Sequence, residues 1–255
     1  MVLRSRAWLH LLLASLAVYG VTFFTRDRLP ARTEILPALY EEPLQEPSNE
    51  PDFVEVAGGT EYLLTPVARY AIRGLVVTYH DSDSWLDISH RKWDDKLNAK
   101  DVSLIWGYNL REGEYEKVTF SHGDWTGYYQ WRGSVRFSGA HFSNNHLLVA
   151  KEKGFYNAVM GCRTGDQVLL EGYLVNYRIR GRPFERKTSL IRDDTGDGAC
   201  EIIYLTRFEV LKEGNRGWRI LHGAGGWAAL VSGIFLVASL VFVQKPLHYL
   251  GGRND

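Results

Sequence analysis

Two uninterrupted apolar segments lie near the ends of the chain, and a long region of mixed polarity separates them. Residues 7–24 carry no formal charge and follow Arg4 and Arg6, and residues 224–243 are likewise uncharged. At about 1.5 Å per residue these segments reach roughly 27–30 Å as helices, which matches the hydrocarbon core of a bilayer. The pattern predicts two transmembrane helices. A cleaved signal peptide is the alternative for the first segment, and a buried core helix is the alternative for the second.

These two segments set the predicted division of the chain. It comprises an N-terminal tail (1–6), transmembrane helix 1 (7–24), an acidic proline-rich linker (25–66), a globular domain (67–222), transmembrane helix 2 (224–243) and a C-terminal tail (244–255). Two spans would place both tails on one side of the membrane. Arg4 and Arg6 favour a cytoplasmic N-terminus, although arginines also flank the inner ends of both spans. We expect the domain to lie outside the cytoplasm, on a bacterial inner membrane.

The predicted linker is rich in proline and acidic residues. Five prolines lie between positions 30 and 51, and six acidic residues lie between positions 41 and 55. This composition is typical of an extended, solvated spacer rather than a folded unit. An acidic docking segment for a partner is the alternative interpretation.

The central region reads mainly as β-strand with one or two helices, an α+β pattern. Runs rich in β-branched and apolar residues predict strands, and apolar residues at helical spacing predict one helix after a possible N-cap at Ser143 or Asn144. In chain order we expect strands at 72–80 and 102–108, a third strand region at 117–120 with 125–131, a helix at 145–160, and strands at 167–177 and 201–211.

The order of three strands, a helix and two strands resembles the OB-fold, a five-stranded small β-barrel. The segment GDQVLLEGYLVNY (165–177) looks like a turn and strand of that fold, and Gly172 would allow the strand to coil tightly. The resemblance covers residues 70–211. It implies a ligand face on the second and third strands and on the loops that join strands 1–2 and 4–5. A different small barrel or an open α+β sheet would give a similar pattern.

Three further stretches resemble an uncharacterised family of bacterial membrane proteins. They are DISHRKWDDKLNAKDVSLIWG (87–107), FSNNHLL (142–148) and RDDTGDGACEIIYL (192–205). That family carries no assigned activity, so the resemblance transfers no catalytic residue to this chain.

Overall charge and cysteine content narrow the function. Thirty basic and thirty acidic residues cancel, which argues against a generic nucleic-acid coat. Two cysteines are too few for a disulfide-dense scaffold or a four-cysteine zinc module. Cys162 and Cys200 could form a disulfide outside the cytoplasm. The strand order argues against it, because Cys162 precedes the fourth strand and Cys200 precedes the antiparallel fifth, which separates them widely.

A local basic and aromatic cluster is the candidate ligand site. Cations hold anions, and flat rings stack on bases or sugars. The cations come from the loop that joins strands 4 and 5 and from the loop that joins strands 1 and 2, and most of the aromatic residues come from the second and third strand regions. The candidates are Arg178, Arg180, Arg182, Arg186, Lys187, Arg192, His90, Arg91, Trp93, Trp106, Tyr108, Trp125 and Tyr128. A solvated basic hairpin beside ordinary core aromatic residues is the alternative.

Histidines and aspartates supply no recognised catalytic or metal motif. His80, His90, His122, His141 and His146 could ligate a metal or act as acid and base, but HExxH and CxxC spacings are absent. The run at 193–198 fails the EF-hand pattern because its twelfth position is Tyr204. The pair His122 and Asp124 reads best as a turn cap. GxSxG, GxGxxG and P-loop motifs are also absent, so we expect no cofactor and no resident metal.

Together these features predict a membrane-tethered, non-enzymatic binding module. Its ligand would be an anionic polymer or glycan, or an envelope protein partner. One alternative is a metal-assisted hydrolase that uses the His and Asp side chains. Another is a structural subunit that forms homo-oligomers through the Gly and Ala residues of transmembrane helix 2.

Overall fold

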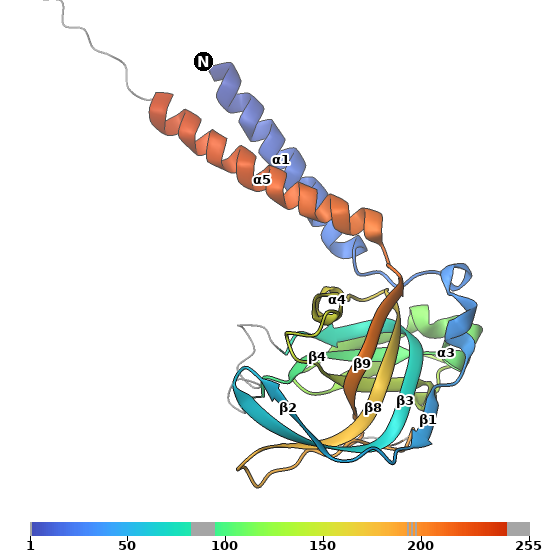
Figure 1. The fold of residues 1–255 in the computed structure, drawn as a ribbon. Helices are drawn as coiled ribbons and strands as arrows, with labels where there is room; N and C mark the ends of the chain where they lie inside the picture. Colours follow the sequence, from blue (N-terminus) through green and yellow to red (C-terminus); the bar gives the residue numbers. More distant parts are fainter. Residues whose placement is uncertain (1, 83–94, 193, 195, 197, 244–255) are drawn as a thin grey trace, which may run out of the picture. The chain divides into compact units, whose positions relative to one another are not determined.

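The structure is a computed structural model that describes residues 2–82, 95–192, 194, 196 and 198–243. Within these residues the chain divides into two compact units, a pair of long helices and a unit that spans residues 29–214. The second unit is built mostly of sheet with short helices (Figure 1). The expectation of a mixed fold dominated by strands is therefore confirmed.

The helical unit consists of α1 (Val2–Thr25) and α5 (Arg216–Val243). Both helices are long and apolar enough to cross a membrane. Large apolar side chains are exposed around them, as expected for helices that bury no single face against a soluble core. The structured helices extend beyond the predicted segments, because α5 begins at Arg216 rather than at position 224.

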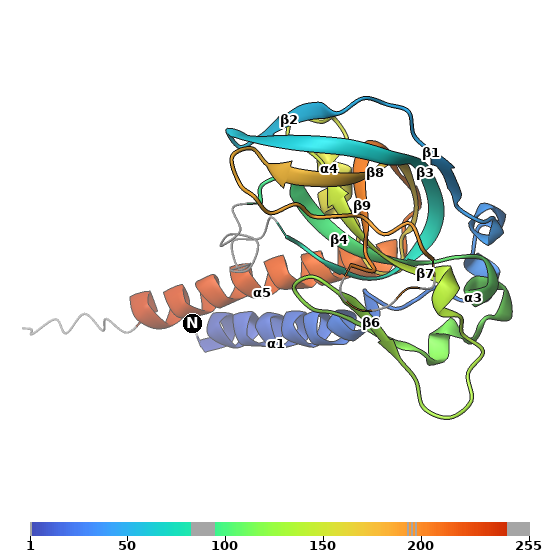
Figure 2. The same ribbon diagram turned by 90° about the horizontal axis from the view of Figure 1, so that it is seen from below.

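The small residues of α5 lie against α1 of the same chain. A Cβ atom at Gly225 would lie 3.3 Å from the backbone nitrogen of Tyr19, so a side chain there would press on the α1 backbone. Thr22 Oγ1 lies 3.0 Å from His222 Nδ1, and the ring of Tyr19 stacks on the same imidazole. The two helices run side by side in opposite directions (Figures 1 and 2). A homo-oligomer through this face of α5 would have to displace α1.

The second unit contains nine strands and two short α-helices among its described residues. The strands are β1 (Leu44–Pro47), β2 (Phe53–Ala57), β3 (Thr60–His80), β4 (Asn98–Ile105), β5 (Thr119–His122), β6 (Gly127–Gln130), β7 (Phe142–Leu148), β8 (Gln167–Ile179) and β9 (Glu201–Lys212). The helices are α3 (Gly107–Glu112) and α4 (Tyr156–Gly161), with 3-10 turns at Arg32–Glu34, Pro37–Tyr40, Glu114–Lys117 and Gly139–His141.

The main sheet is continuous around five of its strands. Its pairing order is β3-β4-β7-β9-β8, and β8 pairs again with β3. The β7–β9 pair is parallel, whereas the other pairs in this circuit are antiparallel. Strands β1 and β2 add to β3, and β5 and β6 form a separate hairpin. Figure 2 shows the long strands curving around a common interior.

The interior is filled by apolar side chains from several strands. Val76, Leu104, Leu170 and Ile203 are fully buried in one cluster that spans the sheet. Gly172 lies at a close approach of β8 and β9, because a Cβ atom there would lie 2.0 Å from the carbonyl oxygen of Tyr204. The β8–β9 register shifts at this point, so the glycine permits the local bend of the strand.

A buried lysine secures α4 against the sheet. The Lys100 side chain is fully buried, and its Nζ donates to the carbonyl oxygens of Cys162 (2.7 Å) and Met160 (3.2 Å), at the end of α4. The same Nζ lies 2.7 Å from a carboxylate oxygen of Asp81. Burial lowers the pKa of Lys100, and Asp81 opposes this effect.

The structure corrects the predicted helix at 145–160. Residues Phe142–Leu148 form β7, a central strand, and only Tyr156–Gly161 are helical. Polar residues in β7 hid its strand character from the sequence pattern. Ser143, Asn144, Asn145 and His146 are all buried. Residues of β4 are hydrogen-bonded to the side chains of Asn144, Asn145 and His146, and Ser143 Oγ accepts a hydrogen bond from Asn145 on the same strand.

The predicted third strand region is also different. Residues 117–131 form a 3-10 turn and the β5–β6 hairpin, which pairs only with itself within the described residues. The predicted strand at 102–108 ends at Ile105, and Gly107 begins α3. These corrections move the third sheet strand from the hairpin to β7.

The segment predicted as a linker is folded. Residues 29–66 belong to the compact second unit and contribute β1, β2 and the start of β3. Leu39 is fully buried in a cluster with Leu75 and Tyr115. Pro37 begins a 3-10 turn and Pro47 lies in the edge strand β1, where a missing backbone donor costs no ladder bond. These two prolines therefore occupy a turn and an edge strand of a folded segment and do not mark an unfolded spacer.

Candidate functional site

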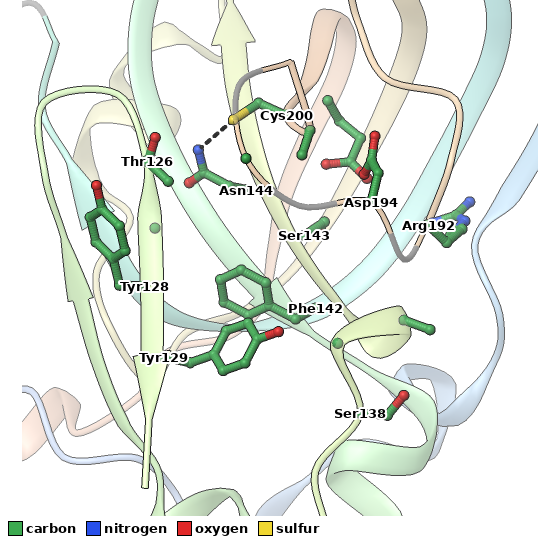
Figure 3. A pocket seen from close by; sticks show the side chains of 16 residues that line it. Thr126, Tyr128, Tyr129, Ser138, Phe142, Ser143, Asn144, Arg192, Asp194 and Cys200 are labelled. Carbon is green, nitrogen blue, oxygen red and sulfur yellow. Dashed lines mark hydrogen bonds between the residues drawn. The ribbon is translucent and has the colours of Figure 1, made fainter.

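Three adjoining cavities form a groove beside β7. The first cavity, of about 720 Å³, lies between the β5–β6 hairpin, β7 and the β8–β9 connection (Figure 3). The second, of about 660 Å³, shares Thr126, Gly196 and Cys200 with the first. The third, of about 310 Å³, shares Phe184 and Arg186 with the second. The combined volume is large enough for a small ligand or a few units of a polymer.

Asn144 links the floor of the groove to the hairpin. Its side-chain oxygen accepts hydrogen bonds from Ser103 Oγ (3.1 Å) and His122 Nε2 (2.8 Å). Its nitrogen donates to the carbonyl oxygen of Trp125 (3.1 Å) and to Cys200 Sγ (3.3 Å), as Figure 3 shows for the sulfur. All four contacts fix this amide, so Asn144 holds the hairpin and the start of β9 in place.

A glycine allows the hairpin to approach the sheet this closely. A Cβ atom at Gly127 would lie 2.0 Å from Ser103 Oγ and 3.0 Å from the Asn144 side-chain oxygen. Any side chain at this position would push β6 away from β4 and β7. The hairpin wall of the first cavity therefore depends on Gly127.

A histidine–aspartate pair lies under the second cavity. Asp101 and His146 are opposite each other on β4 and β7, and His146 Nδ1 lies 2.7 Å from Asp101 Oδ1. Both side chains are almost completely buried. Burial lowers the pKa of His146, but the Asp101 carboxylate raises it by more, to about 9. Asn98 donates a further hydrogen bond to the same carboxylate oxygen, which fixes its orientation.

Arg186 lies at Nε2 of the His146 ring, whereas Asp101 lies at Nδ1. Its Nη2 lies 3.1 Å from His146 Nε2, and the guanidinium charge partly opposes the effect of Asp101 on the pKa of the imidazole. Nη1 donates to Tyr177 Oη (3.1 Å) and lies 3.8 Å from Asp95 Oδ2. The guanidinium lies 4.8 Å from the centre of the Trp125 ring.

Arg192 provides a second cation at the first cavity. Its guanidinium lies 5.3 Å from the centre of the Tyr70 ring and donates hydrogen bonds to Tyr70 Oη (3.2 Å) and Gln45 Oε1 (3.1 Å). It also lies 5.6 Å from the centre of the Trp106 ring. The rings and the amide orient the guanidinium while it lines the cavity.

A buried carboxyl group lines the same cavity. Glu201 begins β9 and is 6% exposed, and burial raises the pKa of its carboxyl to about 8. Its Oε2 atom has no hydrogen-bond partner among the described residues. At neutral pH this carboxyl can therefore act as a hydrogen-bond donor, because most of it is protonated.

The structure brings together only part of the predicted ligand site. Arg182, Arg186, Lys187 and Trp125 line the second or third cavity, and Arg192 and Tyr128 line the first. Tyr108 lies on α3, and Trp106 is completely buried, and neither residue lines one of the three cavities. His90, Arg91 and Trp93 lie outside the described residues.

The expected free positive field in the β8–β9 loop is reduced by ion pairs. Arg180 pairs with Glu61 away from the cavities, and Lys187 Nζ lies 3.9 Å from a carboxylate oxygen of Glu185. Arg178 is exposed on β8 and lines none of the three cavities. The cations that reach the groove act as oriented individual groups rather than as a diffuse basic patch.

Several groove residues were missing from the predicted site. Asp101, Asn144, Cys200 and Glu201 were not among the candidates, and His146 was considered only as a possible acid–base group or metal ligand. The run Ser143–His146 carried a usable signal, because four polar residues before two leucines are unusual for a buried strand. No local pattern could place Asp101 beside it, since strand pairing brings the two together.

The structure also bears on the predictions for His122, for the two cysteines and for the run at 193–198. His122 Nδ1 lies 2.6 Å from the carbonyl oxygen of Gly123, which agrees with a turn-capping role. Cys162 and Cys200 are both free thiols. The run at 193–198 includes positions 193, 195 and 197, which lie outside the described residues. Among the residues that are described, no group of three or more His, Cys, Asp and Glu side chains is placed to hold a metal ion.

Comparison of the chain with protein-family models, with curated proteins and with solved structures returned no match.

Proposed function

We propose that the protein is a membrane-tethered binding module whose groove recognises an anionic polymer or glycan. Helices α1 and α5 would be the tether, and the sheet unit would carry the ligand site. A tether of this kind raises the effective concentration of the module for ligands at the same membrane.

We further propose that the sheet unit is an OB-like barrel. The return of the strand pairing from β8 to β3 supports a closed sheet. In chain order α4 lies between β7 and β8, the third and fourth strands of the five. In this assignment β4 and β7 are the second and third strands. The three cavities then lie on the face and at the loop where OB-folds usually bind ligands.

The single observation that carries the binding proposal is the placement of Arg186 and Arg192. Each guanidinium lies over an aromatic ring, is oriented by hydrogen bonds and lines one of two adjoining cavities. Two fixed guanidinium groups suit successive carboxylate, sulfate or phosphate groups of a repeating polymer. Tyr128 and Phe184 are exposed beside them and offer stacking surfaces for sugar rings.

Binding to defined polyanions tests the proposal. The full chain in lipid nanodiscs would be titrated with oligogalacturonate, oligoglutamate and polyphosphate, which share negative charge but differ in their backbone. We expect oligogalacturonate to bind best, with an affinity that falls as salt rises. Preference for oligoglutamate would instead indicate an acidic protein partner. Absence of binding by all three at low salt would contradict the proposal.

A matched pair of double variants separates groove contacts from net charge. Arg186→Gln with Arg192→Gln removes both groove cations, and Arg180→Gln with Arg207→Gln removes two exposed cations that lie outside the cavities. We expect the groove variant to lose about tenfold or more in affinity and the control to lose little. Arg186→Lys keeps the charge but loses the planar fork, so it should fall between them.

The proposed location outside the cytoplasm has its own test. Single cysteines at Asn49 and at Asp255, in a chain that lacks Cys162 and Cys200, would be exposed to a membrane-impermeant thiol reagent in intact and permeabilised cells. Labelling of position 49 but not 255 in intact cells is expected. The reverse pattern would place the groove in the cytoplasm and would redirect the search toward intracellular anions.

A further inference from the structure

Four arginines gather at one end of the helix pair. Because α1 and α5 lie side by side in opposite directions, the last turn of α1 is next to the first turn of α5 (Figures 1 and 2). Arg26 and Arg28 follow the last residue of α1, and Arg216 and Arg219 lie in the first turn of α5. All four belong to the compact helical unit, so the fold of that unit alone brings them together.

Two hydrogen bonds join the ends of the helices that carry these arginines. Arg219 Nε donates to the carbonyl oxygen of Arg26 at 3.4 Å, and Asn215 Nδ2 donates to the carbonyl oxygen of Arg28. Both bonds run from the start of α5 to the backbone that follows α1. They hold the two ends beside each other, so the four guanidinium groups act on the same region of the surface.

The charge at this end of the helix pair is strongly positive. Residues 19–28 and 215–224 contain four arginines and one acidic residue, Asp27, which leaves a net charge of +3. The Asp27 carboxylate lies 3.1 Å from Nε of Arg26 and offsets the charge of that one arginine. A concentration of positive charge in a neutral protein attracts and holds anions.

The apolar surroundings of the arginines point to a lipid as the anion. Phe24 is 76% exposed, Trp218 is 44% exposed and Ile220 is 61% exposed, all within the same end of the helix pair. The Arg26 guanidinium lies 5.0 Å from the centre of the Phe23 ring. Aromatic rings beside arginines are typical of the level of the lipid headgroups. A soluble polyanion would leave these apolar side chains in water, whereas a phospholipid covers them with its acyl chains.

We propose that Arg26, Arg28, Arg216 and Arg219 form a binding site for the headgroup of an anionic phospholipid. The site belongs to the helical unit and shares no residue with the groove, so it goes beyond recognition of a polyanion by the sheet unit. It rests on the proposed function only because it requires α1 and α5 to be a membrane tether. The lipid lies in the leaflet from which the chain continues into residues 29–214.

The chemistry of the headgroup determines the selectivity that we expect. Guanidinium groups donate paired hydrogen bonds to the oxygens of a phosphodiester. Zwitterionic phospholipids carry the same phosphodiester but also a cationic group, which the arginines repel. The site should therefore prefer a phospholipid with a net negative charge. Each arginine close to an anionic lipid surface contributes about fivefold to the affinity, so the loss of two arginines is measurable.

Titration with two phospholipids of identical acyl chains tests the site. The full chain in a mild detergent would be titrated with phosphatidylglycerol or phosphatidylcholine, and native mass spectrometry would count the lipids that it retains. We expect the first phosphatidylglycerol to bind at least about tenfold more tightly than the first phosphatidylcholine, with a preference that falls as the salt concentration rises. Equal affinity for the two lipids at low salt would overturn the proposal.

Matched variants separate the site from the total charge of the protein. Arg28 and Arg216 are both exposed, and Arg28→Gln with Arg216→Gln should remove most of the preference for phosphatidylglycerol. Arg180→Gln with Arg207→Gln removes two exposed cations of the sheet unit and should leave the preference unchanged. An equal loss in both double variants would contradict a local site. If the first double variant does not fold, Arg28→Gln alone should still lower the preference about fivefold, and an unchanged preference in that variant would overturn the site.

The groove variant distinguishes this proposal from polyanion binding in the groove. Arg186→Gln with Arg192→Gln should keep the preference for phosphatidylglycerol, because neither arginine belongs to the helical unit. In turn, Arg28→Gln with Arg216→Gln should bind oligogalacturonate as the wild type does. Loss of the lipid preference in the groove variant would show that the headgroup binds in the groove and would overturn the site on the helices.

Extraction from vesicles tests the tether on which the lipid site depends. The full chain would be reconstituted into vesicles of phosphatidylcholine alone and washed with alkaline carbonate, which removes proteins that do not span the bilayer. We expect the chain to stay in the membrane fraction. Its release would contradict the tether and the lipid site together. Retention of the chain without a preference for phosphatidylglycerol in the titration would overturn the lipid site alone and leave the tether in place.

Discussion

Asp101 and His146 face each other across β4 and β7, with Asp101 Oδ1 2.7 Å from His146 Nδ1 and almost no solvent contact. This pair lies beneath the groove and holds an imidazole between a carboxylate and the Arg186 guanidinium. Its charge state therefore affects both the stability of the sheet unit and the electrostatics of the site.

The pair predicts a loss of stability at high pH. Asp101 raises the pKa of His146 to about 9 in the folded chain, compared with about 6.5 in an unfolded one. The stabilisation is fully present below about pH 6.5 and disappears as the pH rises through 9. We expect the difference in unfolding free energy between the wild type and Asp101→Asn to shrink by up to about 3 kcal/mol over that interval. Denaturant titrations at several pH values measure this difference in unfolding free energy. A difference that stays constant with pH would contradict the charge interaction between Asp101 and His146.

Glu201 predicts a second pH effect. Burial raises the pKa of its carboxyl to about 8, from about 4.3 in an unfolded chain. The folded state therefore loses stability as the pH rises from about 4.3 through 8. Glu201→Gln removes this ionisable group. The free energy of unfolding should therefore decline by a few kcal/mol less in the variant over the same pH range. Glu50→Gln, at an exposed position, serves as the control and should follow the wild-type curve in the same denaturant titrations.

The folded state of the N-terminal segment predicts a large effect of truncating Leu39. This side chain is fully buried in a 3-10 turn, so Leu39→Ala should cost about 2–5 kcal/mol through lost burial and the cavity left behind. Leu44 on β1 is 45% exposed, and Leu44→Ala should cost much less. Equal effects, measured by chemical denaturation, would mean that residues 29–66 do not pack as described.

The close approach of β8 and β9 predicts that Gly172 cannot be replaced. Gly172→Ala would place a methyl group 2.0 Å from the Tyr204 carbonyl oxygen and should cost several kcal/mol or prevent folding. Gly154 has no atom within 4 Å of its added Cβ, so Gly154→Ala should be neutral or slightly stabilising. Thermal melts of the two variants provide the comparison, and similar melting temperatures would contradict the β8–β9 packing.

The sequence predicted the parts of the fold whose physical signal is local. Long uncharged runs gave α1 and α5, and β-branched runs gave the C-terminal part of β3 and most of β8 and β9. The prediction failed at β7, because its buried Asn144 and His146 find partners on other strands and so resemble exposed residues in the sequence. It also failed at Pro47, which fits an edge strand as well as it fits a spacer.

The candidate site was likewise predictable only where its signal was local in the sequence. Arg186 and Arg192 were predictable as charged loop residues, whereas their orientation depends on Tyr177 and Tyr70, which the fold of the sheet brings beside them. Cys200 had no distinguishing local pattern. It became a candidate only when the parallel pairing of β7 and β9 placed it beside Asn144.

Protection of Cys200 by a bound polyanion is the most direct test that the groove is the binding site. Iodoacetamide alkylation of Cys200 would be timed in the full chain, with and without saturating oligogalacturonate, and buried Cys162 would serve as the internal reference. Because Cys200 lines both large cavities, we predict at least about tenfold slower alkylation when the probe is bound and no protection in Arg186→Gln with Arg192→Gln. An unchanged alkylation rate while the probe is bound would show that the ligand lies elsewhere.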